Sequence, residues 1–164
     1  SQGAASLYQF AQKLTIINIP FHLIIICGKN DFIHKKIHDI SFPMHITTTI
    51  IGFTNRIDDL LTITDLFITK SGGASVCEAI YMNVPLLLDA TSTILKWEQF
   101  NQHFIVKNKF GEIIMHYNDL PDLVTKYLAN KELLATIKNN IASYKKKNGG
   151  IETKKLIDQI FHSQ

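Results

Sequence analysis

Short apolar runs alternate with helix-patterned segments along the first two thirds of the chain. The apolar runs cover residues 21–27, 66–69 and 86–88, while a β-branched run at 46–51 and a short segment at 111–115 are further strand candidates. Continuous apolar runs of this length are typical of parallel strands that are buried on both faces. Helical spacing marks residues 7–14, 31–39, a short segment ending at Leu61, 74–82, 97–107, 119–128, 131–144 and 151–161. This alternation predicts an α/β fold, a doubly wound parallel sheet followed by C-terminal helices.

Residues 65–89 form the most informative stretch, because they predict a strand, a glycine turn, a helix and a second strand. The turn is Ser71-Gly72-Gly73, and the helix ends near Val84-Pro85. Two apolar strands joined by a helix make a parallel crossover, which places the turn at the carboxyl edge of the sheet. Ligands bind at that edge in open parallel sheets.

The glycine turn has the chemistry of a phosphate site. Glycines allow a ligand to approach the main chain closely, and the first turn of the following helix carries N–H groups without intrahelical partners. Ser71, Ser75 and Glu78 fall at i, i+4 and i+7, which predicts one shared face, with Val76, Ala79 and Ile80 toward the sheet. The alternative is that Ser71 or Ser75 merely caps the helix and that Glu78 is an ordinary exposed glutamate.

A similar turn opens the chain, because Ser1-Gln2-Gly3 leads directly into a helical segment. Such a turn normally follows a strand, so we expect the chain to begin inside a larger protein. That first strand would be central in a doubly wound sheet. We therefore expect that the strands at 21–27 and 66–69 do not pair directly.

Composition and charge exclude several classes of function. A length of 164 residues is typical of one domain. The net charge of +3 arises largely from lysines at 145–147 and 154–155, and with one arginine in the chain a solvated helical face is favoured over a nucleic-acid surface. A membrane-surface role stays open. Cys27 and Cys77 form no metal-ligand pair or disulfide framework, which favours a cytoplasmic location.

Several motifs occur in the order and spacing of one protein family. They lie at residues 26–30, 52–60, 64–65, 68–73, 78–79, 84–85 and 98–101. Together they resemble the C-terminal domain of family 28 glycosyltransferases over nearly the whole chain. Within that family the chain is most similar to the monogalactosyldiacylglycerol synthases and processive diacylglycerol glucosyltransferases. The lipid II GlcNAc-transferases of peptidoglycan synthesis are more distant.

The resemblance implies one half of a GT-B fold, in which two Rossmann-like domains face each other. Residues 1–164 would form the C-terminal, UDP-sugar-binding domain without its first strand, and the N-terminal acceptor domain would be absent from this chain. The family transfers sugar with inversion, needs no tightly bound metal or cofactor, and takes its catalytic base from the N-terminal domain. We therefore assign no catalytic or metal-binding residue here, and expect the isolated chain to bind UDP-sugar weakly without turning it over.

The resemblance also implies the donor-site residues. Those facing the diphosphate would be Ser1, Gln2 and Gly3 in a first loop, and Ser71, Gly72, Gly73 and Ser75 in a second. Glu78 would hold the ribose hydroxyls, the main chain of Arg56 and Ile57 would pair with uracil, and Glu98 and Asn101 would hydrogen-bond the donor sugar.

The expected partners follow from the same resemblance. The donor would be UDP-glucose, UDP-galactose or UDP-GlcNAc, and the acceptor a lipid such as diacylglycerol, reached at the inner face of the membrane. Three alternatives stay open: a UDP-GlcNAc-transferase of the peptidoglycan type, half of a UDP-sugar epimerase, and a non-catalytic donor-binding subunit that works with a partner chain.

Overall fold

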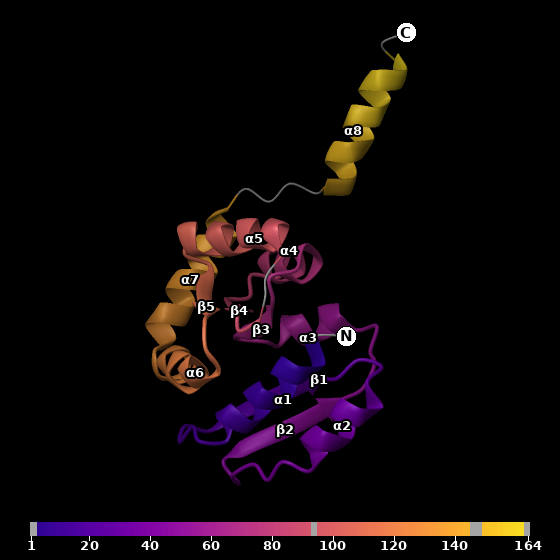
Figure 1. The fold of residues 1–164 in the computed structure, drawn as a ribbon. Coiled ribbons are helices and arrows are strands. Elements are labelled where there is room, and N and C mark those ends of the chain that lie inside the picture. Colours follow the sequence, from indigo (N-terminus) through magenta and orange to yellow (C-terminus); the bar gives the residue numbers. More distant parts are fainter. Residues whose placement is uncertain (1–2, 93–94, 145–148, 163–164) are drawn as a thin grey trace.

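The computed structural model describes residues 3–92, 95–144 and 149–162. Its strands are β1 (Phe21–Ile26), β2 (Ile46–Ile51), β3 (Phe67–Lys70), β4 (Leu86–Asp89) and β5 (Gly111–Ile114). Its helices are α1 (Gly3–Leu14), α2 (Asp31–His38), α3 (Ile57–Thr62), α4 (Gly73–Tyr81), α5 (Lys96–Lys107), α6 (Leu120–Ala129), α7 (Lys131–Ser143) and α8 (Gly149–His162), with a 3-10 turn at Tyr117–Asp119. The predicted alternation of strands and helices is confirmed (Figure 1).

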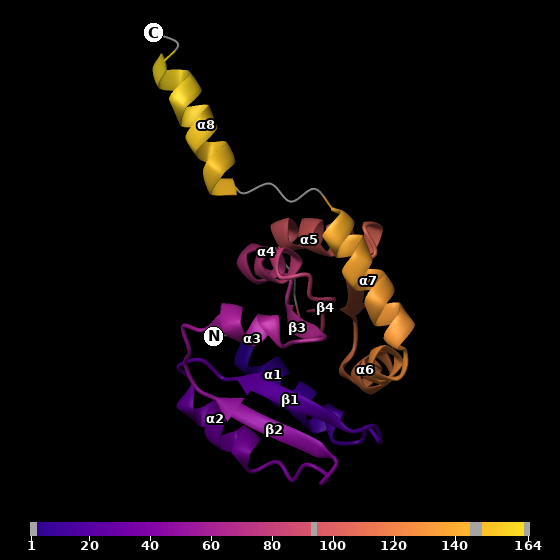
Figure 2. The same cartoon turned by 180° about the vertical axis from the view of Figure 1, so that it is seen from behind.

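The strands form two parallel sheets. β1 pairs with β2, and β4 lies between β3 and β5 (Figure 2). Among the described residues β1 and β3 do not pair with each other, as expected. A further strand between them stays a prediction. The carboxyl ends of β3, β4 and β5 lie along one edge, because all three strands run in the same direction.

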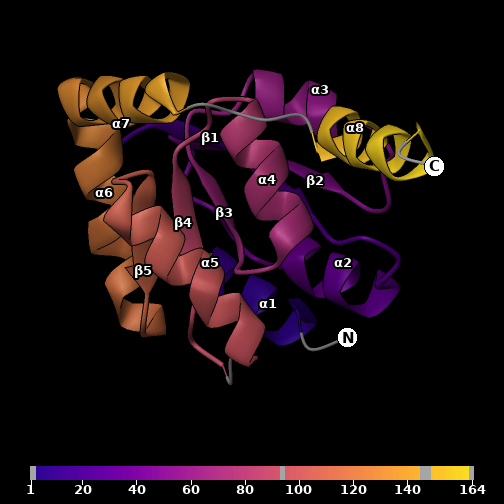
Figure 3. The ribbon, with the colours of Figure 1, turned by 90° about the horizontal axis from the view of Figure 1, so that it is seen from above.

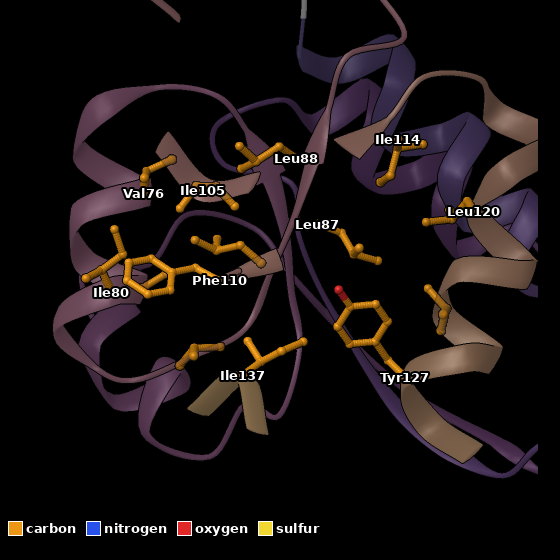
Figure 4. Close-up of a cluster of buried hydrophobic side chains, with 14 of the residues drawn as sticks. Val76, Ile80, Leu87, Leu88, Ile105, Phe110, Ile114, Leu120, Tyr127 and Ile137 are labelled. Carbon is orange, nitrogen blue, oxygen red and sulfur yellow. The ribbon is translucent and has the colours of Figure 1, made fainter. Parts of the chain in front are cut away.

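β4 is the centre of the main hydrophobic core. Leu86, Leu87 and Leu88 have no exposed surface, because helices cover both faces of this sheet. Figure 4 shows Leu88, Ile105 of α5 and Val76 of α4 on one side of the strand, and Leu87 toward Tyr127 of α6 on the other. A strand that is buried on both faces has apolar residues at consecutive positions, and this run allowed the strand to be predicted from the sequence.

Asparagine side chains start two of the helices. Asn30 Oδ1 accepts a hydrogen bond from the Ile33 N–H at 3.0 Å before α2, and Asn130 Oδ1 accepts one from the Leu133 N–H at 2.9 Å before α7. Asp119 precedes α6 at the expected N-cap position, but its carboxylate does not cap that helix. It accepts a hydrogen bond from the His116 N–H instead, because the intervening 3-10 turn directs its side chain backward.

Tyr127 carries a buried hydroxyl that finds no hydrogen-bond partner among the described residues. Figure 4 shows this hydroxyl pointing toward Leu87. Burial, with a smaller contribution from the negative charge of Glu112, raises the pKa of Tyr127 above its ordinary value. The phenol therefore stays protonated at neutral pH.

A Tyr127→Phe variant is expected to be more stable than the wild type by about 1 kcal/mol, because it removes a buried polar atom that makes no hydrogen bond. Urea unfolding at neutral pH measures the change. A loss of stability would contradict it, since that result requires a hydrogen bond to the hydroxyl.

The last described helix, α8, extends away from the rest of the fold in Figures 1 and 2. It carries four exposed apolar residues on one face, Leu156, Ile157, Ile160 and Phe161. Within the described ranges, no helix is both long enough and apolar enough to span a lipid bilayer.

Candidate functional site

The turn between β3 and α4 has the geometry of an anion site. Gly72 occupies the N-cap position with φ −68° and ψ 139°, and no side chain caps the helix. The first turn of α4 contains no acidic residue. Among the described residues no side chain accepts a hydrogen bond from its first N–H groups, which are therefore available to bind a phosphate at the positive end of the helix dipole. The alternative in which Ser71 or Ser75 serves as the cap is wrong.

The predicted face of α4 is confirmed in part. Val76, Ala79 and Ile80 are buried against the sheet, while Ser75 is half-buried and Glu78 is exposed. Ser71 does not share the exposed face, because it precedes the N-cap and is only 2% exposed. Its side chain points into the protein, so Ser71 supports the turn from behind.

Helix α5 packs beside α4 (Figure 3). Two amide side chains of α5 reach the glycine turn. Asn101 Nδ2 donates a hydrogen bond to the Ser71 carbonyl oxygen at 2.7 Å, and Gln102 Nε2 donates one to Ser71 Oγ at 2.8 Å. The Asn101 amide nitrogen also lies 4.0 Å from the position that a Cβ on Gly73 would take. Asn101 therefore lies next to the glycine turn, as it must if both belong to one donor site.

Glu98 lies one helical turn before Asn101, at the start of α5. Its Oε2 accepts a hydrogen bond from the Leu95 N–H at 3.2 Å. In this structure Glu98 therefore acts as a capping acid for α5. Its contact with a sugar stays a prediction.

Arg56 and Ile57 follow β2 and begin α3. The Arg56 side chain is 75% exposed and pairs with Asp59 at 2.6 Å. The hydrogen bond to Asp59 and the negative charge of that carboxylate raise the pKa of Arg56. Among the described residues, no hydrogen bond joins Arg56 or Ile57 to the β3–α4 turn. That the main chain of Arg56 and Ile57 pairs with the uracil ring stays a prediction.

The carboxyl ends of β1 and β2 are tied together beside this loop. The Gly28 N–H donates a hydrogen bond to the Gly52 carbonyl at 3.1 Å, and the Lys29 ammonium lies 5.0 Å from the centre of the Phe53 ring. Gly28 has φ +62°, a backbone conformation that is unfavourable for residues with a side chain. These contacts hold the carboxyl ends of β1 and β2 together, next to the loop that contains Arg56.

Of the predicted N-terminal loop, Gly3 is the first residue of α1, whereas Ser1 and Gln2 lie outside the described residues. In the described part of the chain, no three His, Cys, Asp or Glu side chains are arranged to hold a metal ion.

Residues 1–160 match the family model described as the glycosyltransferase family 28 C-terminal domain. The chain belongs to this family. A processive diacylglycerol β-glucosyltransferase of Bacillus pumilus is 27% identical over 128 residues, which cover 78% of this chain and 33% of that protein. A chloroplastic monogalactosyldiacylglycerol synthase of Spinacia oleracea is 25% identical over 109 residues, which cover 66% of this chain and 20% of that protein. This family 28 domain therefore spans a third or less of the length of these two relatives.

Solved structures confirm the fold. The crystal structure of Acinetobacter baumannii MurG superposes with a TM-score of 0.79 at 19% identity, over 94% of this chain and 46% of that one. The match confirms the predicted architecture of the C-terminal half of a GT-B enzyme.

The resemblance did not identify Gln102, although this residue holds the turn of the family 28 domain. No spacing pattern in the sequence marks it, since its partner Ser71 lies 31 residues away. Its only signal is its place directly after Asn101 on α5.

Proposed function

We propose that this chain is the donor-binding domain of an inverting glycosyltransferase that moves a hexose from a UDP-sugar to a lipid acceptor such as diacylglycerol. The observation that carries the proposal is the uncapped N-terminus of α4, which lies at the carboxyl end of β3 with Asn101 of α5 beside it. Membership of family 28 and the diacylglycerol enzymes among its relatives support the substrate classes.

The diphosphate would bind at the first turn of α4, where Gly72 and Gly73 leave room for its oxygens. The N–H groups there point at the anion before the reaction starts. Negative charge that develops on the departing UDP is therefore stabilised without reorganisation of the site. Ser75 is half-buried on the same turn and would donate its hydroxyl to a phosphate oxygen, so that the site needs no resident metal ion.

The rest of the donor would extend to both sides of the phosphates. Glu78 is exposed further along α4, where its carboxylate would accept hydrogen bonds from the ribose hydroxyls. The main chain at Arg56 and Ile57 would pair with uracil. Glu98 and Asn101 share one face of α5 and would contact the sugar. The acceptor and the base that deprotonates it would belong to an N-terminal domain, so this chain alone is expected to bind without turnover.

Calorimetric titration with UDP, UDP-glucose, UDP-galactose and UDP-GlcNAc tests the proposal. Glu78→Ala is expected to weaken UDP binding by about 10-fold or more, because hydrogen bonds to a charged group are lost. Glu132→Ala removes an equivalent charge from an exposed position on α7 and should leave UDP binding unchanged. No UDP binding by a demonstrably folded wild-type chain would contradict the proposal.

The same titration decides between two donors. A UDP-GlcNAc-transferase of the peptidoglycan type is the second candidate, because the motifs that the chain shares with family 28 also resemble that more distant branch. A preference for UDP-GlcNAc over UDP-glucose and UDP-galactose would support it, whereas the reverse order would support the glycolipid assignment.

A further inference from the structure

Two consecutive residues of α5 converge on a single residue of the glycine turn. Asn101 binds the carbonyl oxygen of Ser71 and Gln102 binds its hydroxyl, at 2.7 Å and 2.8 Å. Ser71 is 2% exposed, so both hydrogen bonds lie in a region of low dielectric constant, where they are stronger than in water. Main chain and side chain of Ser71 are therefore held at once.

The hold on Ser71 sets the direction of the next peptide N–H. The Ser71 carbonyl and the Gly72 N–H belong to one planar trans peptide and point in opposite directions. When Asn101 draws the carbonyl toward α5, the Gly72 N–H is aimed away from α5. Two successive glycines would otherwise leave this segment with wide conformational freedom.

The bond to Gln102 also sets the role of the Ser71 hydroxyl. A hydroxyl carries one donor and two acceptor lone pairs, and the amide nitrogen of Gln102 occupies one of these lone pairs. Gln102 thereby fixes the rotamer of Ser71, and this rotamer keeps the side chain inside the protein. Without Gln102, the carbonyl bond to Asn101 alone would hold Ser71.

We propose that Gln102 is a positioning residue for diphosphate recognition. It locks Ser71 together with Asn101, and so orders the Gly72-Gly73 turn before the ligand arrives. The inference rests on the proposed function, because it assigns a phosphate to this turn. Gln102 itself touches no part of the donor in this mechanism.

The first test needs no ligand. Backbone order parameters from NMR relaxation are expected to fall at Gly72 and Gly73 in Gln102→Ala, from about 0.85 toward about 0.6. Gln99→Ala is the matched control, because Gln99 is an exposed glutamine on the same helix, and it should leave both values unchanged. Unchanged order at Gly72 and Gly73 in Gln102→Ala would overturn the proposal.

The second test compares UDP with uridine, which lacks the phosphates, in a titration followed by amide chemical shifts. Gln102→Ala is expected to weaken UDP binding by about 3- to 10-fold and to leave uridine binding unchanged. Ser71→Ala should act in the same way, and the double variant should be no weaker than either single variant, because one hydrogen bond is lost in all three. Equal losses for UDP and uridine would show a merely structural role and overturn the proposal.

The two tests separate failure of this inference from failure of the proposed function. If wild-type chain binds UDP and Glu78→Ala weakens that binding, an unaffected Gln102→Ala overturns the inference alone. If folded wild-type chain binds no UDP, the proposed function and the phosphate role of Gln102 both fail.

Discussion

A Gly72→Asp variant is expected to lose at least about 100-fold in UDP affinity while the chain stays folded. The new carboxylate would sit at the N-cap of α4, where it accepts hydrogen bonds from the N–H groups that would bind the phosphate. It would also repel the diphosphate across a few ångströms, and roughly 3 kcal/mol of repulsion corresponds to the expected factor.

The protein should tolerate this substitution. Gly72 has φ −68°, which is accessible to any residue, and no heavy atom lies within 4 Å of the Cβ that a side chain would add. Aspartate is also a slightly better N-cap than glycine, by a few tenths of a kcal/mol at most. Thermal unfolding should therefore show an unchanged or slightly higher midpoint.

Two further variants at Gly72 separate charge from capping. Gly72→Asn offers the same cap without the charge and should reduce affinity less than Gly72→Asp, whereas Gly72→Ala should reduce it least. Calorimetry with UDP ranks the three. Wild-type affinity in Gly72→Asp would mean that the phosphates do not bind at the N-terminus of α4.

Gly111→Ala is expected to destabilise the fold by about 3 kcal/mol, a large part of the roughly 5–15 kcal/mol typical of a domain. Gly111 begins β5 opposite Leu86 of β4. A Cβ at Gly111 would lie 1.8 Å from the Leu86 carbonyl oxygen, far inside van der Waals contact. The strands would have to separate at the point where the Leu86 N–H bonds the Phe110 carbonyl at 3.1 Å.

Urea unfolding with Gly52→Ala as the matched control measures this effect. A Cβ at Gly52 would lie 3.7 Å from the Gly28 carbonyl oxygen, which is an ordinary contact, so this variant should change stability by less than about 1 kcal/mol. An unfolding midpoint for Gly111→Ala equal to that of the wild type would mean that β5 does not approach β4 so closely.

The sequence by itself determined the order and type of the elements. The run at residues 86–88 could be recognised as a buried strand, because a strand covered on both faces needs apolar residues at every position. Its place between β3 and β5 came from the structure. The glycine turn after β3 could be predicted as an anion site for a similarly local reason, since the glycines and the helix start adjoin one another. The buried face of α4, with Val76, Ala79 and Ile80, followed from helical periodicity.

Only the tertiary structure decided how α5 meets that turn. Periodicity placed Ser71 with Ser75 and Glu78, yet the structure buries Ser71 and bonds it to Asn101 and Gln102, 30 and 31 residues away. The close approach of Gly111 to Leu86 is likewise a contact between distant segments that the sequence pattern did not reveal. Spacing along the chain encodes local hydrogen bonds and the direction of a buried face, because both repeat with the geometry of the backbone. Which atoms meet between distant segments depends on how whole helices and strands pack, and that packing is set by many side chains together.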